Sequence, residues 1–371
     1  MGRKASVKNL TQAKNAKNDE FYTQYIDIQK EIEKYLEYDV DTFRNKVVYC
    51  NCDDPFESNF FRYFALNFNK LGLKQLITTS YKPSPVANTQ LALFGDDDTL
   101  PKLKSRPKVT ANKFIINSVH DIDGDGEFNL KDIAKQLKAN KSNEWTPLKG
   151  DGDFRSDECV KLLEQSDIVV TNPPFSLFRL YMKQLFDYDK KFLVIGNINC
   201  LTYKEIFPKI KENKAWIGNG MGRWISGFIV PDSYELYGSE ARIEEDGTRI
   251  VATNNCLWLT NLDHGRRHQP LSLMTISENL KYSKHKELKG KRSYDRYDNY
   301  DAIEVPFTDA IPSDYDGEMG VPVTFLDKYN PDQFEIVGSL ITNNPDSYSY
   351  GVPYVKNKKV YARVLIKHRK K

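Results

Sequence analysis

Residues 167–181, "DIVVTNPPFSLFRLY", decide the fold. The apolar run "DIVVT" predicts a buried strand, and the spacing of apolar residues from "SLFRLY" onward predicts a helix. Between them lies an Asn-Pro-Pro-Phe segment, residues 172–175, which forms the connection from the predicted parallel strand to the helix. Ligands of open α/β sheets bind beyond the carboxyl ends of the parallel strands. We therefore expect a binding site at this segment.

The first two hundred residues alternate between apolar strands and amphipathic helices, which is the pattern of a sheet covered by helices on both faces. Four runs predict strands: "KVVYC" (46–50), "LKQLITTSY" (73–81), "DIVVT" (167–171) and "KFLVIGN" (191–197). Two segments between them predict helices: "SNFFRYFALNFNKLG" (58–72) and "SDECVKLLEQS" (156–166), the second with Ser156 as its N-cap. The sequence therefore predicts an α/β fold.

A chain of 371 residues is too long for one typical hydrophobic core, so we expect more than one domain. Residues 1–18 are basic without a carboxylate and predict an N-terminal tail. The α/β pattern covers residues 19–213, with an insertion at about 82–150 that has its own strand, "KFIINSV", and a helix at about 129–138. In residues 214–371 short β-like runs alternate with irregular connections, which predicts a second, mixed and mostly β domain.

Composition excludes several classes of protein. Lys and Arg (54) nearly balance Asp and Glu (51), for a net charge of +3, so the average composition does not indicate a nucleic-acid partner. Residues 356–371 are nevertheless basic without a carboxylate, and such a run either attracts phosphates or is a solvated tail. No apolar run has the length of a membrane span and no signal peptide is recognisable, so we expect a cytoplasmic protein without a membrane partner. The five cysteines form no C-x-x-C pair, which argues against a disulfide framework and a zinc ribbon.

The Asn-Pro-Pro-Phe segment has the composition of a site for an amino group. Pro173 and Pro174 lack N–H donors and stiffen the loop, so the side-chain oxygen of Asn172 and the Pro173 carbonyl offer two acceptors to one spot. Accepting both hydrogens of an exocyclic amino group favours the nucleophilic form of its nitrogen. Phe175 offers a face for stacking, and a base in a duplex must be flipped out to reach it. The alternative is a proline-rich turn that merely ends a strand; the flanking strand and helix favour a site.

Further motifs accompany this segment. They are "DEFYTQ" (19–24), "VYCNCDDP" (48–55), "GDGDFRS" (150–156), "LWLTNLDHGRR" (257–267) and "MGVPVTFLDKYNPDQFEIVG" (319–338). With these motifs the chain resembles, over nearly its whole length, the S-adenosylmethionine-dependent DNA adenine N6-methyltransferases, and among them the EcoRI-type modification methylases. The order of the motifs is similar to the γ arrangement, in which the target-recognition domain comes last.

The resemblance implies a Rossmann-like class I methyltransferase sheet, S-adenosyl-L-methionine as cofactor and double-stranded DNA as substrate. The implied catalytic residues are Asn172, Pro173, Pro174 and Phe175. The implied cofactor-binding residues are Phe21, Tyr22 and Thr23 at the methionine end, Cys50, Asn51 and Asp53 in the first loop, Asp153 and Phe154 at the adenine, and Asn172 between cofactor and target base. In this scheme Asp53 holds the ammonium or the ribose. Two departures stand out: the first loop has no glycine, as in the EcoRI-like subgroup, and "TTSY" lacks the acid that usually binds the ribose hydroxyls.

Residues 121–132, "DIDGDGEFNLKD", fit the calcium-binding loop of an EF-hand. The candidate ligands are Asp121, Asp123, Asp125, Glu127 and Asp132. The last position usually carries the longer Glu, and a predicted strand precedes the loop where an EF-hand has a helix. Two interpretations are therefore open: a structural Ca²⁺ site, and an acidic turn held by its own hydrogen bonds from side chain to backbone.

Candidate DNA contacts in the second domain are Arg223, Arg266 and Arg267, because arginine binds guanine edges and phosphates alike; ordinary surface loops are the alternative. We predict an enzyme that flips adenine from duplex DNA and transfers a methyl group to its N6, and the resemblance suggests a short palindrome with an AATT core. We expect a monomer; whether a cognate restriction endonuclease accompanies it, without direct contact, is open. The rival functions are methylation of an RNA base or a protein glutamine, and DNA binding without catalysis.

Overall fold

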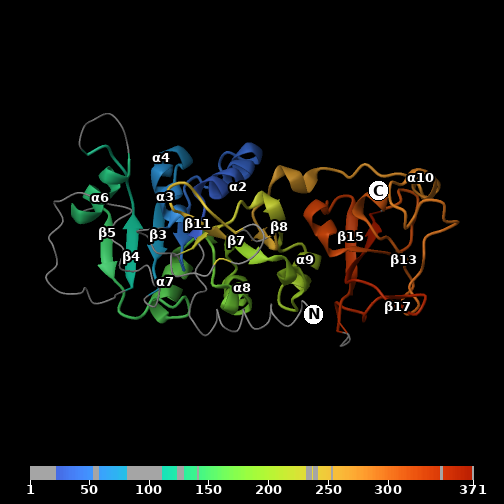
Figure 1. Cartoon of the computed structure of the whole chain (residues 1–371). Helices are drawn as coiled ribbons and strands as arrows, with labels where there is room; N and C mark the ends of the chain where they lie inside the picture. The colour runs from blue at the N-terminus through green and yellow to red at the C-terminus, as the bar shows by residue number, and fades with distance from the viewer. Residues whose placement is uncertain are drawn as a thin grey trace. The chain divides into compact units, whose positions relative to one another are not determined.

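The computed structural model of the chain describes residues 22–52, 58–81, 111–122, 129–139, 142–230, 236, 241–251, 254–342 and 346–369 (Figure 1). These residues form two compact units. The first consists of Met1–Asn197 and Gly220–Leu262, and the second of Ile198–Asn219 and Asp263–Lys371. Both units combine helices with multi-stranded sheets, which confirms the predicted α/β class in its broad form.

The first unit is built on a sheet with the strand order β5-β4-β3-β2-β6-β7-β12-β8. Its strands are β5 (Glu144–Pro147), β4 (Asn112–Ile116), β3 (Gln75–Thr79), β2 (Val47–Cys50), β6 (Ile168–Thr171), β7 (Lys191–Asn197), β12 (Cys256–Thr260) and β8 (Trp216–Met221), of which Gly220 and Met221 belong to this unit. The neighbours β3, β2, β6 and β7 are parallel, and these are the four predicted apolar runs. Strands β4, β5 and β12 pair antiparallel to their neighbours.

Helices cover both faces of this sheet, as Figure 1 shows. They are α2 (Tyr25–Tyr38), α3 (Asn59–Leu66), α4 (Phe68–Leu71), α6 (Leu130–Ala139), α7 (Asp157–Gln165) and α8 (Phe178–Asp187). Val48 and Cys50 of β2 belong to the core that packs against α2 and α3. Because side chains alternate along a strand, Tyr49 points to the other face, where it lies beside Cys159 of α7. Ser156 accepts a hydrogen bond from the Cys159 backbone and is the predicted N-cap of α7.

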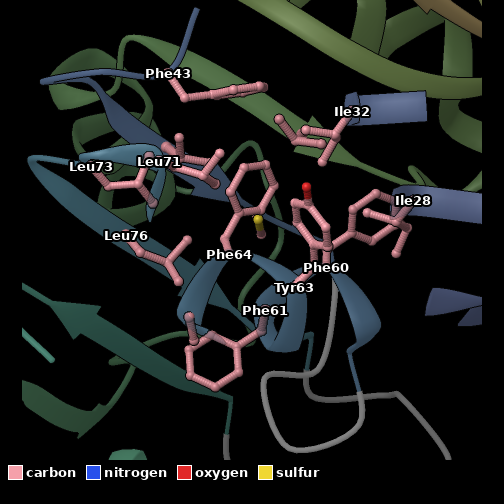
Figure 2. Close-up of a cluster of buried hydrophobic side chains, with 14 of the residues drawn as sticks. Ile28, Ile32, Phe43, Phe60, Phe61, Tyr63, Phe64, Leu71, Leu73 and Leu76 are labelled. Atoms are coloured by element: carbon pink, nitrogen blue, oxygen red, sulfur yellow. The ribbon is translucent and has the colours of Figure 1, made fainter. Parts of the chain in front are cut away.

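The core on the α2 side is rich in aromatic residues (Figure 2). Helix α3 carries Phe60, Phe61, Tyr63 and Phe64, so most of its surface is apolar. Figure 2 shows them gathered with Ile28, Ile32, Phe43, Leu71, Leu73 and Leu76. Since burying one such side chain stabilises the fold by about 1.5–3 kcal/mol, this cluster holds α3 firmly beside the end of β2.

The predicted insertion enlarges the sheet. Its expected strand is β4, which pairs antiparallel with β3, and its expected helix is α6. Strand β5 then pairs with β4 and becomes the edge of the sheet. Residues 82–110, 123–128 and 140–141 lie outside the described part of the chain.

A second, smaller sheet of the first unit has the order β1-β9-β11-β10. Its strands are β1 (Tyr22–Thr23), β9 (Phe228–Val230), β11 (Arg249–Val251) and β10 (Arg242–Ile243). The compact units therefore differ from the predicted domains 19–213 and 214–371: residues 220–262 join the first unit, because β9 pairs with β1 and β12 with β7. Apolar runs predict strands but do not determine which strands pair with each other. The assignment of residues 220–262 to the first unit was therefore not predictable.

The second unit contains the sheet β13-β14-β18-β15 and the hairpin β16–β17. Its elements are α9 (Phe207–Lys211), α10 (Ile276–Tyr282), β13 (Ile303–Glu304), β14 (Met319–Pro322), β15 (Phe334–Leu340), β16 (Tyr354–Val355), β17 (Lys358–Lys359) and β18 (Arg363–His368). Inside it Arg363 forms a buried ion pair with Glu304, at 2.5 Å between Nη2 and Oε1. Throughout the described ranges no helix is both long and apolar enough to cross a membrane.

Candidate active site

The Asn-Pro-Pro-Phe segment follows directly on β6, the strand that the apolar run predicted. A short 3-10 helix, η1 (Phe175–Leu177), leads from it into α8. Pro173 is buried, whereas Asn172, Pro174 and Phe175 are half-buried. The predicted succession of strand, stiff loop and helix is therefore present, and its loop lies at the carboxyl end of a central parallel strand, as expected for a binding site.

Asn51 ties the ends of two neighbouring strands together. It follows β2 and is only 2% exposed. Its carbonyl oxygen accepts a hydrogen bond from the Thr171 hydroxyl at the end of β6, and its side-chain oxygen accepts one from the Tyr181 hydroxyl in α8. Burial raises the pKa of Tyr181 well above its ordinary value, so the phenol stays protonated and keeps donating. Residues on both sides of the Asn-Pro-Pro-Phe loop are thus held to Asn51.

Thr23 is buried, and its strand partner links it to the Asn-Pro-Pro-Phe loop. Its strand β1 pairs with β9, and its carbonyl accepts a hydrogen bond from the Asn59 side chain at 2.8 Å. The Thr23 side chain is 3% exposed, and its hydroxyl has no hydrogen-bond partner among the described residues. Phe228, the partner of Thr23 in β9, contacts the Phe175 ring edge-on, with centroids 6.4 Å apart. The two predicted motifs, FYTQ and Asn-Pro-Pro-Phe, are therefore brought together through Phe228.

A polar network fastens the end of the same motif. Gln24 donates from Nε2 to the Ser226 hydroxyl at 2.8 Å and to the Gly227 carbonyl at 3.0 Å. Asp27, in the first turn of α2, accepts from the backbone N–H and the hydroxyl of Ser226. Asp27 is buried, and burial raises its pKa. Nothing in the sequence pairs residues about two hundred positions apart, so these contacts were missed.

The GDGDF motif passes the end of β3 closely. Gly152 has φ of +80°, and a Cβ atom there would lie 1.9 Å from the Ser80 carbonyl oxygen, so only glycine fits. Phe154 is 5% exposed and packs edge-on against Tyr181 of α8, with ring centroids 5.1 Å apart. The Asp153 carboxylate accepts hydrogen bonds from Arg155, which lower its pKa and keep it ionised. The ends of β3, β2 and β6 therefore meet around these residues.

These residues fit a cofactor that carries an ammonium group, a carboxylate and an adenine ring. The buried Thr23 hydroxyl has no hydrogen-bond partner among the described residues, Asp153 is an anionic acceptor, and Gly152 has no side chain at its close approach to Ser80. The Cys50 side chain, by contrast, is part of the hydrophobic core. Phe21 and Asp53, two further predicted cofactor residues, lie outside the described part of the chain.

Arg266 and Arg267, two of the three predicted DNA-binding arginines, have partners within the second unit. Arg266 donates to the Asn219 carbonyl at 2.7 Å and forms an ion pair with Asp327. Arg267 is 8% exposed, and its guanidinium lies 3.8 Å above the Trp216 ring. Both side chains thus hold the segment around β8, and DNA contact by either one stays a prediction. Arg223 falls in the 3-10 helix η3 (Gly222–Trp224); its side chain is not described.

The predicted calcium loop is described only at its two ends. The Asp132 side chain is fully buried, and its two oxygens accept hydrogen bonds from the Ile122 N–H at 3.0 Å and the Asn129 N–H at 2.9 Å. Asp121 is exposed, while Asp123, Asp125 and Glu127 lie outside the described residues. Within the described ranges no group of three or more His, Cys, Asp or Glu is placed to hold a metal. Asp132 thus bonds to backbone N–H groups on both sides of residues 123–128, as the second of the two interpretations expects.

Comparison with known proteins gives the family of the chain. The profile of the family described as "Adenine-specific methyltransferase EcoRI" matches residues 9–369. The chain is 46% identical to the type II methyltransferase M.EcoRI of Escherichia coli, over 100% of this chain and 99% of that protein. It is 34% identical to M.MpnI of Mycoplasma pneumoniae and 35% identical to M.MgeORF184P of Mycoplasma genitalium, each over 97% of this chain and 98% of the relative. No solved structure matches the chain.

The chain belongs to the EcoRI family of adenine-specific methyltransferases. This confirms the resemblance drawn from its motifs and makes the chain an adenine-specific DNA methyltransferase. Membership in a methyltransferase family also implies S-adenosylmethionine as the methyl donor.

Proposed function

We propose that this enzyme flips an adenine out of duplex DNA and receives it at the Asn-Pro-Pro-Phe loop, where N6 accepts a methyl group by direct displacement. The observation that carries the proposal is the position of this loop at the carboxyl end of β6, tied through Thr171 and Tyr181 to Asn51 and contacting Phe228 through Phe175. Parallel strands β3-β2-β6-β7 with helices on both faces support a Rossmann-like class I arrangement for the first unit.

In the proposed mechanism the protein orients and polarises an amino group. The Asn172 side-chain oxygen and the Pro173 carbonyl accept the two N6 hydrogens, which favours a nucleophilic nitrogen and stabilises the positive charge that grows during attack. Pro174 keeps the loop rigid, and Phe175 stacks on the base. S-adenosylmethionine, when bound, supplies an electrophilic methyl group on a sulfonium. After transfer the surplus proton leaves N6 towards solvent, because the methylated amine is a weak base.

We assign the cofactor to the residues around Asn51. Tyr22 and Thr23, with Phe21, would border its methionine end, and Asp53 would hold its ammonium or ribose. Asp153 and Phe154 would contact its adenine. Asn172 would join cofactor and target base. The Asn51–Tyr181 hydrogen bond supports this assignment, because it joins the end of β2 to α8. Cys50 would contribute its backbone only, since its side chain lies in the core.

The wider setting is also part of the proposal. The second unit would recognise the target, a short palindrome with an AATT core, and the enzyme would act as a monomer in the cytoplasm. M.EcoRI, M.MpnI and M.MgeORF184P carry the name type II methyltransferase, and on that basis we propose a role in restriction–modification, in which methylation protects DNA from an endonuclease with the same target.

Transfer of labelled methyl groups tests the proposal. Purified protein is incubated with labelled S-adenosylmethionine and unmethylated duplex DNA, with RNA and unfolded polypeptide as competing substrates, and the DNA is digested to nucleosides. We expect label in N6-methyladenine. Asn172→Ala should lower turnover by about 10²–10³-fold, the range found when one transition-state hydrogen bond is removed, with cofactor binding retained. Asn255→Ala, at an exposed asparagine of the same unit, is the matched control and should keep full turnover. Label confined to RNA or polypeptide, or full turnover by Asn172→Ala, would refute the proposal.

A further inference from the structure

The hairpin β16–β17 near the C-terminus has an unusually well-anchored turn. Its strands pair Tyr354 with Lys359 and Val355 with Lys358, so the turn consists of Lys356 and Asn357. Both turn residues have positive φ, 52° and 62°, a conformation that costs energy in side chains other than glycine. The Asp298 carboxylate accepts hydrogen bonds from both turn N–H groups, at 3.1 and 2.7 Å, and thereby holds the hairpin in one conformation.

One side of the hairpin is fixed to the second unit. Val355 is 9% exposed and packs with Tyr297, Leu340 and Leu365 in a hydrophobic cluster. Asn299 donates to the Val352 carbonyl at 2.9 Å and accepts from the Tyr354 N–H at 3.3 Å. The hairpin is therefore a rigid projection with a buried base.

The hairpin also presents cations and aromatic rings to solvent. Lys358 and Lys359 are exposed, and no ion pair to either is found among the described residues, whereas Lys356 pairs with Asp295 at 2.7 Å. Tyr354 is 39% exposed, and Tyr361, two residues after β17, is 84% exposed. The chain contains no carboxylate side chain after Asp346, so no nearby acid in sequence offsets this charge.

We propose that the β16–β17 hairpin binds the sugar–phosphate backbone of duplex DNA, with Lys358 and Lys359 contacting phosphates and the rings of Tyr354 and Tyr361 lying against the backbone beside them. The inference rests on the proposed function and adds a surface to it. A preformed, basic and aromatic projection suits a polyanion of regular charge spacing, because binding it costs little ordering of the protein and releases counterions from the DNA. Backbone contacts position the enzyme without reading sequence.

Salt-dependent binding of the Lys358→Ala/Lys359→Ala variant tests this surface. The probes are two duplex oligonucleotides of equal length, one with a central AATT palindrome and one without AATT. We expect weaker binding to both duplexes by the same factor. The slope of log K against log salt should fall by about 2, close to 0.9 for each lost phosphate contact. Binding of S-adenosylmethionine should stay unchanged.

Two further variants separate a specific surface from a general loss of charge. Lys286→Ala/Lys289→Ala removes two exposed lysines of the same unit and should leave the salt slope unaltered. Asp298→Ala raises the net charge but releases the turn, so we expect weaker binding despite the added positive charge. An unchanged slope in the hairpin variant, an equal fall in the Lys286/Lys289 variant, or tighter binding by Asp298→Ala would overturn the inference.

These outcomes are distinct from failure of the proposed function. A wild-type protein that methylates adenine while the hairpin variants bind DNA normally would refute the hairpin alone. A wild-type protein that labels no adenine would refute the function. Thermal unfolding of each variant confirms that it is folded before its DNA binding is interpreted.

Discussion

The carboxylate of Asp27 accepts two hydrogen bonds from Ser226, one from the backbone N–H at 2.9 Å and one from the hydroxyl at 2.8 Å. These two residues, 199 positions apart, join the start of α2 to the segment that leads into β9. Strand β9 pairs with β1 and, through Phe228, contacts Phe175 of the Asn-Pro-Pro-Phe loop. Asp27 therefore helps to position β9 and, through Phe228, the Asn-Pro-Pro-Phe loop.

Replacing Asp27 should separate positioning from catalysis. Asp27→Ala leaves the N–H and hydroxyl of Ser226 without their acceptor, which should cost about 1–3 kcal/mol of stability and weaken S-adenosylmethionine binding. Asp27→Asn keeps one acceptor oxygen and should restore most of the affinity, because no buried charge is then needed. Calorimetry with the cofactor and urea unfolding measure both quantities. Equal cofactor affinity in wild type and Asp27→Ala would contradict a positioning role.

Two glycines of the GDGDF region form a matched pair. Gly152→Ala places a Cβ atom against the Ser80 carbonyl and forces a residue with a side chain to φ of +80°, so we expect a loss of more than about 2 kcal/mol in unfolding free energy and weaker cofactor binding. Gly150 has no atom within 4 Å of its would-be Cβ, so Gly150→Ala should leave stability within about 1 kcal/mol of wild type. Chemical denaturation of the two variants checks the contrast; similar stabilities would disprove the tight approach of Gly152.

The Asn51–Tyr181 hydrogen bond lends itself to a double-mutant cycle. Asn51→Ala leaves the buried Tyr181 hydroxyl without its acceptor, and Tyr181→Phe removes the donor, so each should destabilise the fold by about 1–3 kcal/mol. The double variant should cost less than the sum, with a coupling of about 0.5–3 kcal/mol. Strict additivity in urea unfolding would show that the two groups do not interact in solution.

Because His264 is buried, we expect the protein to lose stability in acid. Its ring nitrogen Nε2 lies 3.0 Å from the Ile217 carbonyl, and burial lowers its pKa from 6.5 to about 4. As pH falls, His264 is therefore protonated in the unfolded chain before it is protonated in the folded protein. Its contribution to the free energy of unfolding is fully present above the unfolded pKa and is lost as pH falls from about 6.5 towards 4. At 1.36 kcal/mol per pKa unit the loss is roughly 3 kcal/mol.

The variant His264→Gln isolates this contribution, because glutamine can still donate to the Ile217 carbonyl but does not titrate. Urea unfolding at neutral pH and at about pH 4.5 measures the pH dependence of both proteins. We expect the wild type to lose more stability than the variant between these values. Identical pH dependence would show that His264 is not held neutral in the folded protein.

Much of the first unit was predictable because its signals are local. The four parallel strands are uninterrupted apolar runs, and β6, the rigid loop and α8 follow from one stretch of fifteen residues. The family motifs added the candidate cofactor segments, which stay a prediction. The partners of these segments were not predictable. Gln24 and Asp27 form hydrogen bonds with Ser226 because β1 pairs with β9, and no local sequence pattern predicts that pairing.

The arginines and acids that the sequence singled out show the same difference between what local patterns predict and what the fold determines. The pattern of Arg266 and Arg267 suggested DNA contacts, but the fold gives both side chains partners near β8. The spacing of acids in residues 121–132 suggested ligands, whereas Asp132 accepts backbone hydrogen bonds at the ends of the loop. Residue type and spacing indicate which chemistry a side chain can perform, and the fold determines which partners it has within the protein.

The sequence by itself determined the strands, the helices and the succession of strand, rigid loop and helix around residues 172–175, because hydrophobic period, proline geometry and capping act over a few residues. The tertiary structure alone decided that residues 220–262 complete the first unit, that Phe228 contacts Phe175 and that Asp298 fixes a basic hairpin. Those contacts join residues far apart in the chain, and they form only where burial and hydrogen bonding over the whole fold outweigh the entropy of bringing the segments together.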